Sequence, residues 1–108
     1  MKQADLKRAI SGGERQVLSL DKKRFGCGKV FSFGAVDIDL RNLAVWITAD
    51  TDVQRDELRR SGALIDQFRV AFRDPGYPES AIPEIRFEFE SQQTVDRDFN
   101  GTWWHAVK

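Results

Sequence analysis

Histidine and cysteine are nearly missing from this chain of 108 residues, since each occurs once. A protein metal site generally needs three or four ligands, so His105 and Cys27 cannot form one alone. A single cysteine also cannot form an internal disulfide, which favours a reducing compartment. We therefore expect no metal, no cofactor and no disulfide.

Long apolar runs and nucleotide-binding glycine loops are also lacking. No stretch approaches the roughly 20 apolar residues of a membrane span, and the first twenty residues lack the apolar run of a signal peptide. The glycines at 12, 13, 26 and 28 have neither the spacing of a Walker loop nor that of a dinucleotide fingerprint. These absences predict a soluble cytoplasmic protein without membrane contact, in which the glycines form turns and caps.

What is present is typical of a globular protein. Apolar residues make up 41% of the chain and charged residues 31%, values that suit a soluble domain with one hydrophobic core. A chain of this length can bury enough surface to fold without disulfides or metals. We expect residues 1–108 to form a single globular domain.

The charge is zero overall but unevenly distributed. Residues 1–30 contain eight basic and three acidic residues, whereas residues 74–98 contain seven acidic and two basic residues. The two segments could attract each other in the fold, or one could recognise a charged partner. They could also form two solvated faces, which is the common case for surface charge.

The first thirty residues predict a short helix and a loop. Residues 2–11 have helical apolar spacing, and Gly12-Gly13 indicates the end of that helix. Residues 16–20 could form a brief strand. Residues 21–28 combine charge with two glycines and are typical of a loop.

A β-hairpin is predicted next. Residues 29–40 are rich in Phe, Val and Ile. The two phenylalanines occupy odd positions before Gly34-Ala35 and the apolar residues after it occupy even positions, which predicts a β-bulge there. Arg41-Asn42 predicts a tight connection into a second strand at 43–48. Because that second strand is apolar on both parities, we expect it to be central in the sheet.

The middle of the chain predicts two helices. Thr51-Asp52-Val53-Gln54 matches a capping box, and Ser61-Gly62 interrupts the first helix and could cap a second one. The second helix carries an apolar stripe that should pack on the sheet, formed by Leu64, Ile65, Phe68 and Phe72. Residues 74–78 contain two prolines and a glycine, which end the helical region.

The C-terminal part predicts a strand, a short helix and a final strand. Residues 84–90 alternate between apolar and charged residues, with the charged ones facing water. Ser91 can cap a short helix. Asn100-Gly101 could form a hairpin turn, but we prefer it as the left-handed end of that helix, because the residues before it have a helical pattern. Residues 102–107 are predicted as the last strand. On a strand Trp103 and Trp104 face opposite sides, and the sequence leaves open which of them is buried.

Together these elements predict an α+β fold. We expect a four- or five-stranded, mainly antiparallel sheet with helices packed mostly on one face.

Catalytic and metal-binding interpretations have limited support. Cys27 follows three basic residues that could lower its thiol pKa, and His105 is the one histidine that could serve as its base. Asp37 and Asp39 share a strand parity and could bind a hard cation if a third oxygen ligand were near. The default is a structural or surface role for all four residues, so we assign no catalytic residue and no metal ligand.

Nucleic-acid binding is a further alternative. The loop from Lys22 to Lys29 combines basic residues with Phe25, a mixture found in single-strand binding surfaces. The chain as a whole is neutral, however, and contains a strongly acidic segment, which makes binding to a phosphate backbone unfavourable.

The interpretation we prefer is a small non-enzymatic protein-binding domain of accessory or inhibitor type. Its acidic segment at 79–98 and its C-terminal aromatic strand would meet a protein partner with a basic surface. The residues predicted to bind the partner are Glu84, Glu88, Glu90, Trp103, Trp104 and His105. A homodimer through an apolar edge of the last strand is also possible in this scheme. The alternatives are a small enzyme that uses Cys27 or His105, and a nucleic-acid-binding module that uses the basic loop.

Overall fold

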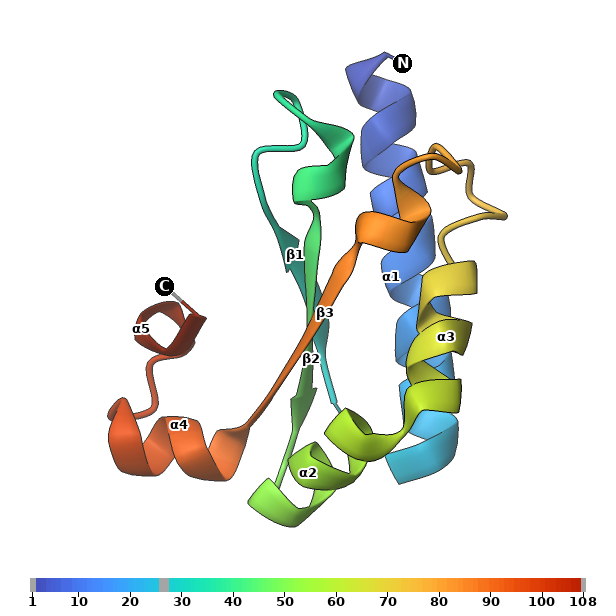
Figure 1. Cartoon of the computed structure of the whole chain (residues 1–108). Helices are drawn as coiled ribbons and strands as arrows, with labels where there is room; N and C mark the ends of the chain where they lie inside the picture. The colour runs from blue at the N-terminus through green and yellow to red at the C-terminus, as the bar shows by residue number, and fades with distance from the viewer. Residues whose placement is uncertain (1, 26–27, 108) are drawn as a thin grey trace.

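A three-stranded sheet with helices on both faces forms the protein (Figure 1). The computed structural model describes residues 2–25 and 28–107, with the side chains of residues 24 and 25 outside the description. The α-helices are α1 (Gln3–Phe25), α2 (Asp52–Arg60), α3 (Gly62–Val70), α4 (Gln92–Asp98) and α5 (Trp103–Val107). The strands are β1 (Val30–Phe33), β2 (Ala44–Ala49) and β3 (Arg86–Ser91), and two short 3-10 turns are η1 (Leu40–Asn42) and η2 (Ile82–Glu84).

The sheet is smaller than the sequence predicts and is not mainly antiparallel. Its strand order is β1-β2-β3, with β1 antiparallel and β3 parallel to the central strand β2. The mixture of helices and strands and the central position of the second strand are confirmed. The prediction of four or five strands is wrong because residues 16–20 belong to α1 and the segment predicted as the last strand forms α5. The parallel pair arises because α2 and α3 form a crossover that returns the chain to the same end of the sheet.

Helix α1 continues through both glycines that were expected to end it. A Cβ atom at Gly13 would lie 2.3 Å from Cδ1 of Phe72, and one at Gly12 would lie 2.8 Å from Cβ of Pro75. These two glycines therefore allow a close approach to the segment that ends α3, and they are not a stop signal. The predicted strand at 16–20 and most of the predicted loop at 21–28 belong to the same helix.

The hairpin is present, but its connection is longer than predicted. Strand β1 ends at Phe33, and the chain returns to β2 through residues 34–43. Gly34 has a φ of +129°, and a Cβ there would lie 2.0 Å from the carbonyl oxygen of Asn42. The glycine thus closes the base of a loop, so the predicted β-bulge and the tight turn at Arg41-Asn42 are both wrong. The parity change at Gly34 marks the end of the strand.

The helical middle of the chain follows the prediction closely. Thr51 and Gln54 form the reciprocal hydrogen bonds of a capping box at the start of α2. The break at Ser61-Gly62 is confirmed, although the Ser61 hydroxyl donates to the Glu57 carbonyl instead of capping α3. Phe68 and Phe72 of the apolar stripe are fully buried.

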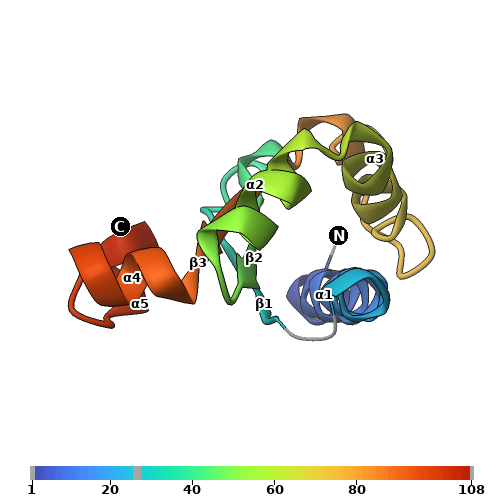
Figure 2. The same cartoon turned by 90° about the horizontal axis from the view of Figure 1, so that it is seen from below.

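The hydrophobic core lies between the sheet and the pair α1 and α3, which cover the same face (Figure 2). Val45 and Ile47 of β2 and Phe89 of β3 contribute the sheet side of this core. Arg69 of α3 reaches the carbonyl oxygens that precede β3, with 2.8 Å from its Nη1 to the oxygen of Ile85. Within the described residues, no helix is both long enough and apolar enough to cross a membrane.

The C-terminus contains the largest departure from the prediction. Ser91 caps α4 by accepting a hydrogen bond from the Thr94 amide, as expected. Asn100 and Gly101 have φ values of 51° and 77°, which confirms a left-handed end to this helix and rules out the alternative hairpin. The next segment is helix α5, not a strand. Five residues are too few for apolar periodicity to separate a single helical turn from a strand.

Candidate functional site

The second face of the sheet carries aromatic and charged side chains. Strand alternation directs Phe31 and Phe33 of β1 and Trp46 of β2 away from the core face. Strand β3 adds Arg86 and Glu88 to the same side, opposite Ala44 and Trp46 in the parallel register. This side of the sheet faces α4 and α5 (Figure 2).

Four rings form a continuous cluster on this side, and we call Phe31, Phe33, Trp46 and Trp103 the aromatic face. Phe31 stacks on Trp46 with ring centroids 6.5 Å apart and an interplanar angle of 8°. Phe33 and Trp103 both contact the ring of Phe31 edge to face, with ring centroids 5.6 and 6.1 Å from it. Such pairs stabilise a protein by about 0.5–1.5 kcal/mol beyond the area they bury.

Helix α5 covers the aromatic face incompletely. Trp103 is half-buried, and its Nε1 donates a 2.8 Å hydrogen bond to Oε1 of Gln92. Phe33 remains 43% exposed and Trp104 60% exposed. Phe33 lines a hollow of about 260 Å³ together with Gly34, Ala44, Trp46, Arg86, Glu88 and Val107. A ligand or a partner side chain could reach the sheet through this hollow.

The predicted acidic residues are dispersed by the structure. Glu88 lies in the hollow of the aromatic face and is half-buried. Glu84 lies in η2, which precedes the amino end of β3, and is exposed. Glu90 forms a 2.8 Å ion pair with Arg55, and its side chain is only 16% exposed. Of the three glutamates, Glu88 alone therefore shares a surface with the predicted tryptophans.

The predicted aromatic residues occupy α5. Trp103 faces the sheet and Trp104 faces outward, which answers the question that the sequence left open. His105 is also on the exposed side of this helix. Whether any of the six predicted residues binds a partner stays a prediction.

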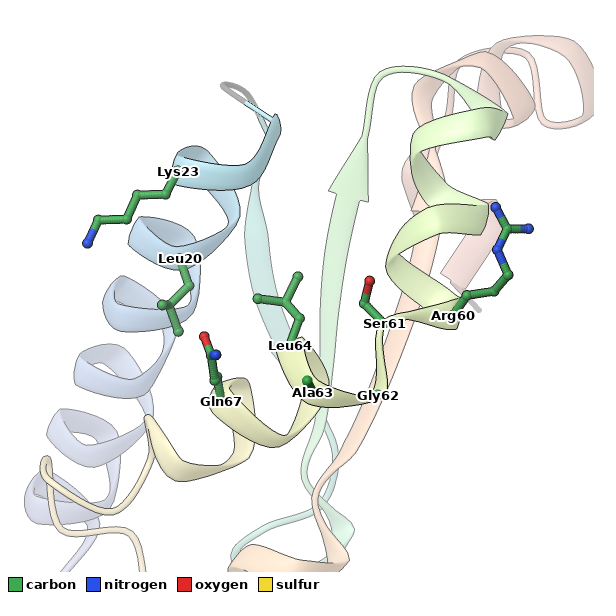
Figure 3. Close-up of a pocket in the computed structure, with 8 residues that line it drawn as sticks. All are labelled: Leu20, Lys23, Arg60, Ser61, Gly62, Ala63, Leu64 and Gln67. Atoms are coloured by element: carbon green, nitrogen blue, oxygen red, sulfur yellow. The ribbon is translucent and has the colours of Figure 1, made fainter.

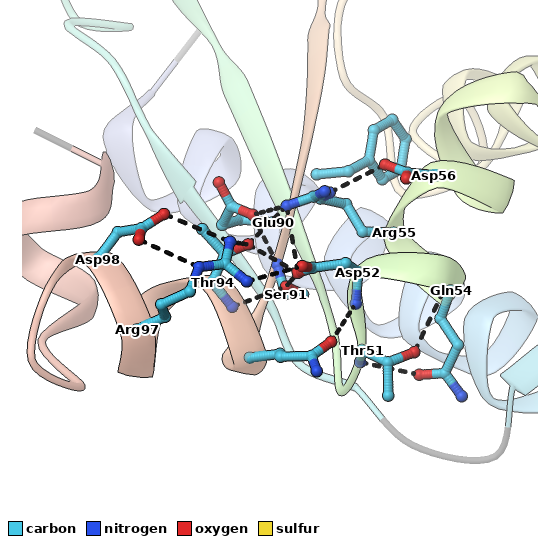
Figure 4. A network of polar contacts seen from close by, with 12 residues as sticks. Thr51, Asp52, Gln54, Arg55, Asp56, Glu90, Ser91, Thr94, Arg97 and Asp98 are labelled. Carbon is cyan, nitrogen blue, oxygen red and sulfur yellow. Dashed lines mark hydrogen bonds and ion pairs between the residues drawn. The ribbon is translucent and has the colours of Figure 1, made fainter.

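A polar network joins the amino ends of α2 and α4 at the carboxyl ends of β2 and β3 (Figure 4). Asp52 accepts hydrogen bonds from the hydroxyls of Ser91 and Thr94, the latter at 2.7 Å, and from Arg97 at 3.1 Å. Arg55 links Thr94 to Glu90.

Those hydroxyl hydrogen bonds hold the pKa of Asp52 well below its usual range, with Arg97 and Arg55 adding to the effect. A carboxylate with so low a pKa is a poor general base for Ser91. We assign this network to fixing α4 against α2 and β3, because every side chain in it already has a partner inside the network.

A buried carboxyl group belongs to the last turns of α1. Asp21 is fully buried, and neither of its oxygen atoms has a hydrogen-bond partner among the described residues. A Cβ at Gly28 would lie 2.2 Å from Oδ2 of Asp21, so only glycine fits beside it. Burial raises the pKa of Asp21 to about 6. Burial also raises the pKa of Glu14, which lies about two turns before Asp21 in α1. The Ser32 hydroxyl lowers the pKa of Glu14 in part.

The remaining catalytic and metal interpretations gain no support from the geometry. Cys27 lies outside the described residues. Asp39 caps η1 and pairs with Arg41, whose hydrogen bonds lower the pKa of Asp39 to about 2. Asp37 is exposed in the loop before it. No cluster of three His, Cys, Asp or Glu side chains suited to a metal ion occurs in the described part of the chain.

The basic N-terminal segment does not neutralise the acidic one. In the described ranges, the ion pairs of residues 74–98 join them to Arg55, Arg73, Asp52 or each other, and none reaches residues 1–30. Lys22 and Lys23 lie on the last turns of α1 instead of in a loop. The charge separation that the sequence shows is therefore preserved in the fold.

Phe31, Phe33 and Trp46 are the site residues that the sequence analysis missed. The signal was present, because Phe31 and Phe33 share a strand parity. The expected turn at Arg41-Asn42 would have paired Phe31 with a residue beyond the second strand, whereas the ten-residue loop pairs it with Trp46. An error in loop length thus hid the cluster.

Comparison with known proteins does not name the site. No protein-family model, no curated protein and no solved structure matches this chain. Any function must therefore be argued from the geometry described above.

Proposed function

We propose that this chain is a small non-enzymatic protein-binding domain and that the aromatic face is its docking surface. The observation that carries the proposal is the incomplete cover of that face, which leaves Phe33 43% exposed beside a hollow. Large aromatic side chains surrounded by polar ones are typical of the residues that dominate binding energy. On the core face, by contrast, the rings of Phe68 and Phe72 are fully buried.

The partner should carry a basic surface with an apolar side chain at its centre. Glu88 lies in the hollow, and Asp96 and Asp98 are exposed on α4 nearby. Complementary charge mainly increases the rate of encounter and the specificity, whereas the apolar contact with Phe33 and Trp46 supplies affinity. Relative to the sequence-based prediction, the proposal keeps Glu88 and Trp103 and replaces Glu84 and Glu90 by the aromatic residues of β1 and β2.

The test compares three variants of the full chain. A partner is first captured from an extract of the native host by the wild-type protein, identified, and purified. Its Kd is then measured by calorimetry against the wild type, Phe33→Ser, Glu88→Lys and the control Glu79→Lys. Glu79 belongs to the same acidic segment but lies before η2, and its pair with Arg73 is exposed. Circular dichroism melting checks that each variant is folded.

Phe33→Ser and Glu88→Lys should each weaken binding about tenfold or more. The control Glu79→Lys should change the Kd less than about twofold. Equal binding by all four proteins, or an equal loss in the control, would overturn the proposal. Light scattering over a dilution series covers self-association: a wild-type dimer that Phe33→Ser abolishes would mean that the face binds a second copy instead.

A further inference from the structure

A second surface, on the other side of the sheet, is lined by basic side chains. A hollow of about 560 Å³ separates the last turns of α1 from the junction of α2 and α3 (Figure 3). Its lining consists of Leu20, Lys23, Arg60, Ser61, Gly62, Ala63, Leu64 and Gln67. In Figure 3, Leu20 and Leu64 face each other across the gap, while Lys23 on α1 and Arg60 on α2 lie on its two sides with their side chains directed outward. The hollow therefore has an aliphatic floor and a cation on each side.

A neighbouring hollow extends the same surface along α1. It has a volume of about 460 Å³, shares Lys23 with the first, and adds Arg15, Leu18 and Lys22. Within the described residues, neither lining contains an aspartate or a glutamate. We call the two hollows together the basic groove. The two linings, which share Lys23, carry four cations together, and the function proposed above does not use them.

The break between α2 and α3 keeps the groove open. A Cβ added at Gly62 would meet no heavy atom within 4 Å, and Ala63 is exposed at the start of α3. The amino end of a helix carries partial positive charge, which has the same sign as Lys23 and Arg60. A bound segment would thus find both room and a uniformly positive rim.

We propose that the basic groove docks an acidic amphipathic segment of a second protein. An apolar side chain of that segment would lie between Leu20 and Leu64, and its carboxylates would meet Lys23 and Arg60. Charge complementarity selects this occupant, because cations on both sides of an aliphatic floor match a chain that alternates acidic and apolar side chains.

Two other occupants fit less well. Single-stranded nucleic acid binds largely by stacking its bases on aromatic rings, and the described lining of the groove has none. The chain's own acidic helix α4 cannot enter the groove of the same molecule, because it lies on the opposite side of the sheet (Figure 2). Together with the aromatic face, the groove would let this domain bridge two proteins of opposite charge.

The test uses defined probes and the full-length protein. The first is a fluorescein-labelled peptide of about 14 residues, roughly four helical turns, with Leu at three- and four-residue spacing and Glu at most other positions. There are three comparison probes: the same peptide with Ser in place of Leu, the same peptide with Lys in place of Glu, and an oligothymidylate of equal length. Fluorescence anisotropy gives the Kd of each probe for the wild type, Lys23→Glu/Arg60→Glu, Ala63→Glu and the control Lys7→Glu.

The Glu/Leu peptide should bind the wild type, and both groove variants should weaken it about tenfold. Lys7 is exposed near the other end of α1, so Lys7→Glu should change the Kd less than about twofold. The Ser-containing peptide should bind more weakly than the Glu/Leu peptide, because it lacks the apolar contact.

Three results would overturn the proposal. They are no binding of the Glu/Leu peptide at roughly 1 mM protein, an equal loss in Lys7→Glu, and equal or tighter binding of the oligothymidylate, which would assign the groove to nucleic acid. Phe33→Ser should leave peptide binding unchanged. The groove and the aromatic face can therefore fail or succeed independently.

Discussion

The two faces of the three-stranded sheet are covered by helices of very different length. The core face packs against α1, a helix of 23 residues, and against α3. The aromatic face is approached by α4 and α5, which have seven and five residues. Val45 and Ile47 on the core face are completely buried, whereas Trp46 between them is only half-buried. The same strand thus contributes to a closed interior and to an open surface.

This difference separates stability from recognition within one small domain. Each fully buried aliphatic or aromatic side chain contributes about 1.5–3 kcal/mol, so the closed face supplies most of the free energy of folding. The open face contributes less to folding, and its rings remain accessible to another molecule. Substitutions on the core face should therefore lower the stability more than substitutions on the aromatic face, whose main effect should be on binding.

The largest effect is expected where α1 approaches α3 most closely. Gly13→Ala would place a Cβ 2.3 Å from the ring of the fully buried Phe72, so one of the two elements must shift. We expect a loss of about 2–3 kcal/mol in the free energy of unfolding, although alanine favours a helix by about 1 kcal/mol. Urea denaturation followed by circular dichroism measures the change.

Gly62→Ala is the matched control, because a Cβ there meets open space. It should be neutral or stabilise the protein by a few tenths of a kcal/mol. If both glycine variants were equally stable, α1 would not pack on Phe72 as described, and the contrast between the two faces would lose its main support.

The second effect concerns pH and the buried Asp21, which belongs to the same helix α1. Its pKa of about 6 in the folded protein exceeds the ordinary value of 3.8. Between these values the carboxyl group ionises in the unfolded chain but not in the folded one, so stability falls as the pH rises toward 6. Asp21→Asn should remove this loss, which is on the order of 2 kcal/mol between pH 4 and pH 7.5.

The same pH range separates the effect of Asp21 from the effects of Asp39 and Asp52. The pKa values of Asp39 and Asp52 are lowered, so their contributions change only below about pH 4, with the opposite sign. Glu14 has a raised pKa and should leave a smaller fall of the same sign in the variant. Unfolding free energies of wild type and Asp21→Asn that run parallel across this range would show that Asp21 is not buried as an unpaired acid.

Local chemistry made several helix starts and ends predictable. The capping box at Thr51, the break at Ser61-Gly62 and the left-handed Asn100-Gly101 end all depend on neighbouring residues, and all three are confirmed. Gly13 shows the limit of such reasoning. Its role is set by Phe72, which is distant in the sequence, so local rules misinterpret it as a helix end.

The candidate site was less predictable for the same reason. Glu90 appeared to be a solvated strand residue, but α2 brings Arg55 against it. Trp46 was recognised as part of a central strand, yet its ring partner Phe31 depends on a loop length that the sequence did not reveal. The sequence thus indicated which residue types would matter at the C-terminus, but not which strand residues they would join.

The smallest effects should arise on the aromatic face, and they test whether α5 is bound there. Trp103→Ala removes the hydrogen bond to Gln92 and the edge contact with Phe31, and it should cost about 1–2 kcal/mol. Trp104→Ala on the exposed side of the same turn should change the unfolding free energy by less than about 0.5 kcal/mol. Because Trp103 contacts Phe31, its loss should also increase amide exchange across α5, as measured by hydrogen exchange. If the two tryptophan variants were equally stable and equally protected, α5 would not cover the sheet through Trp103, and the aromatic face would be more open than the structure shows.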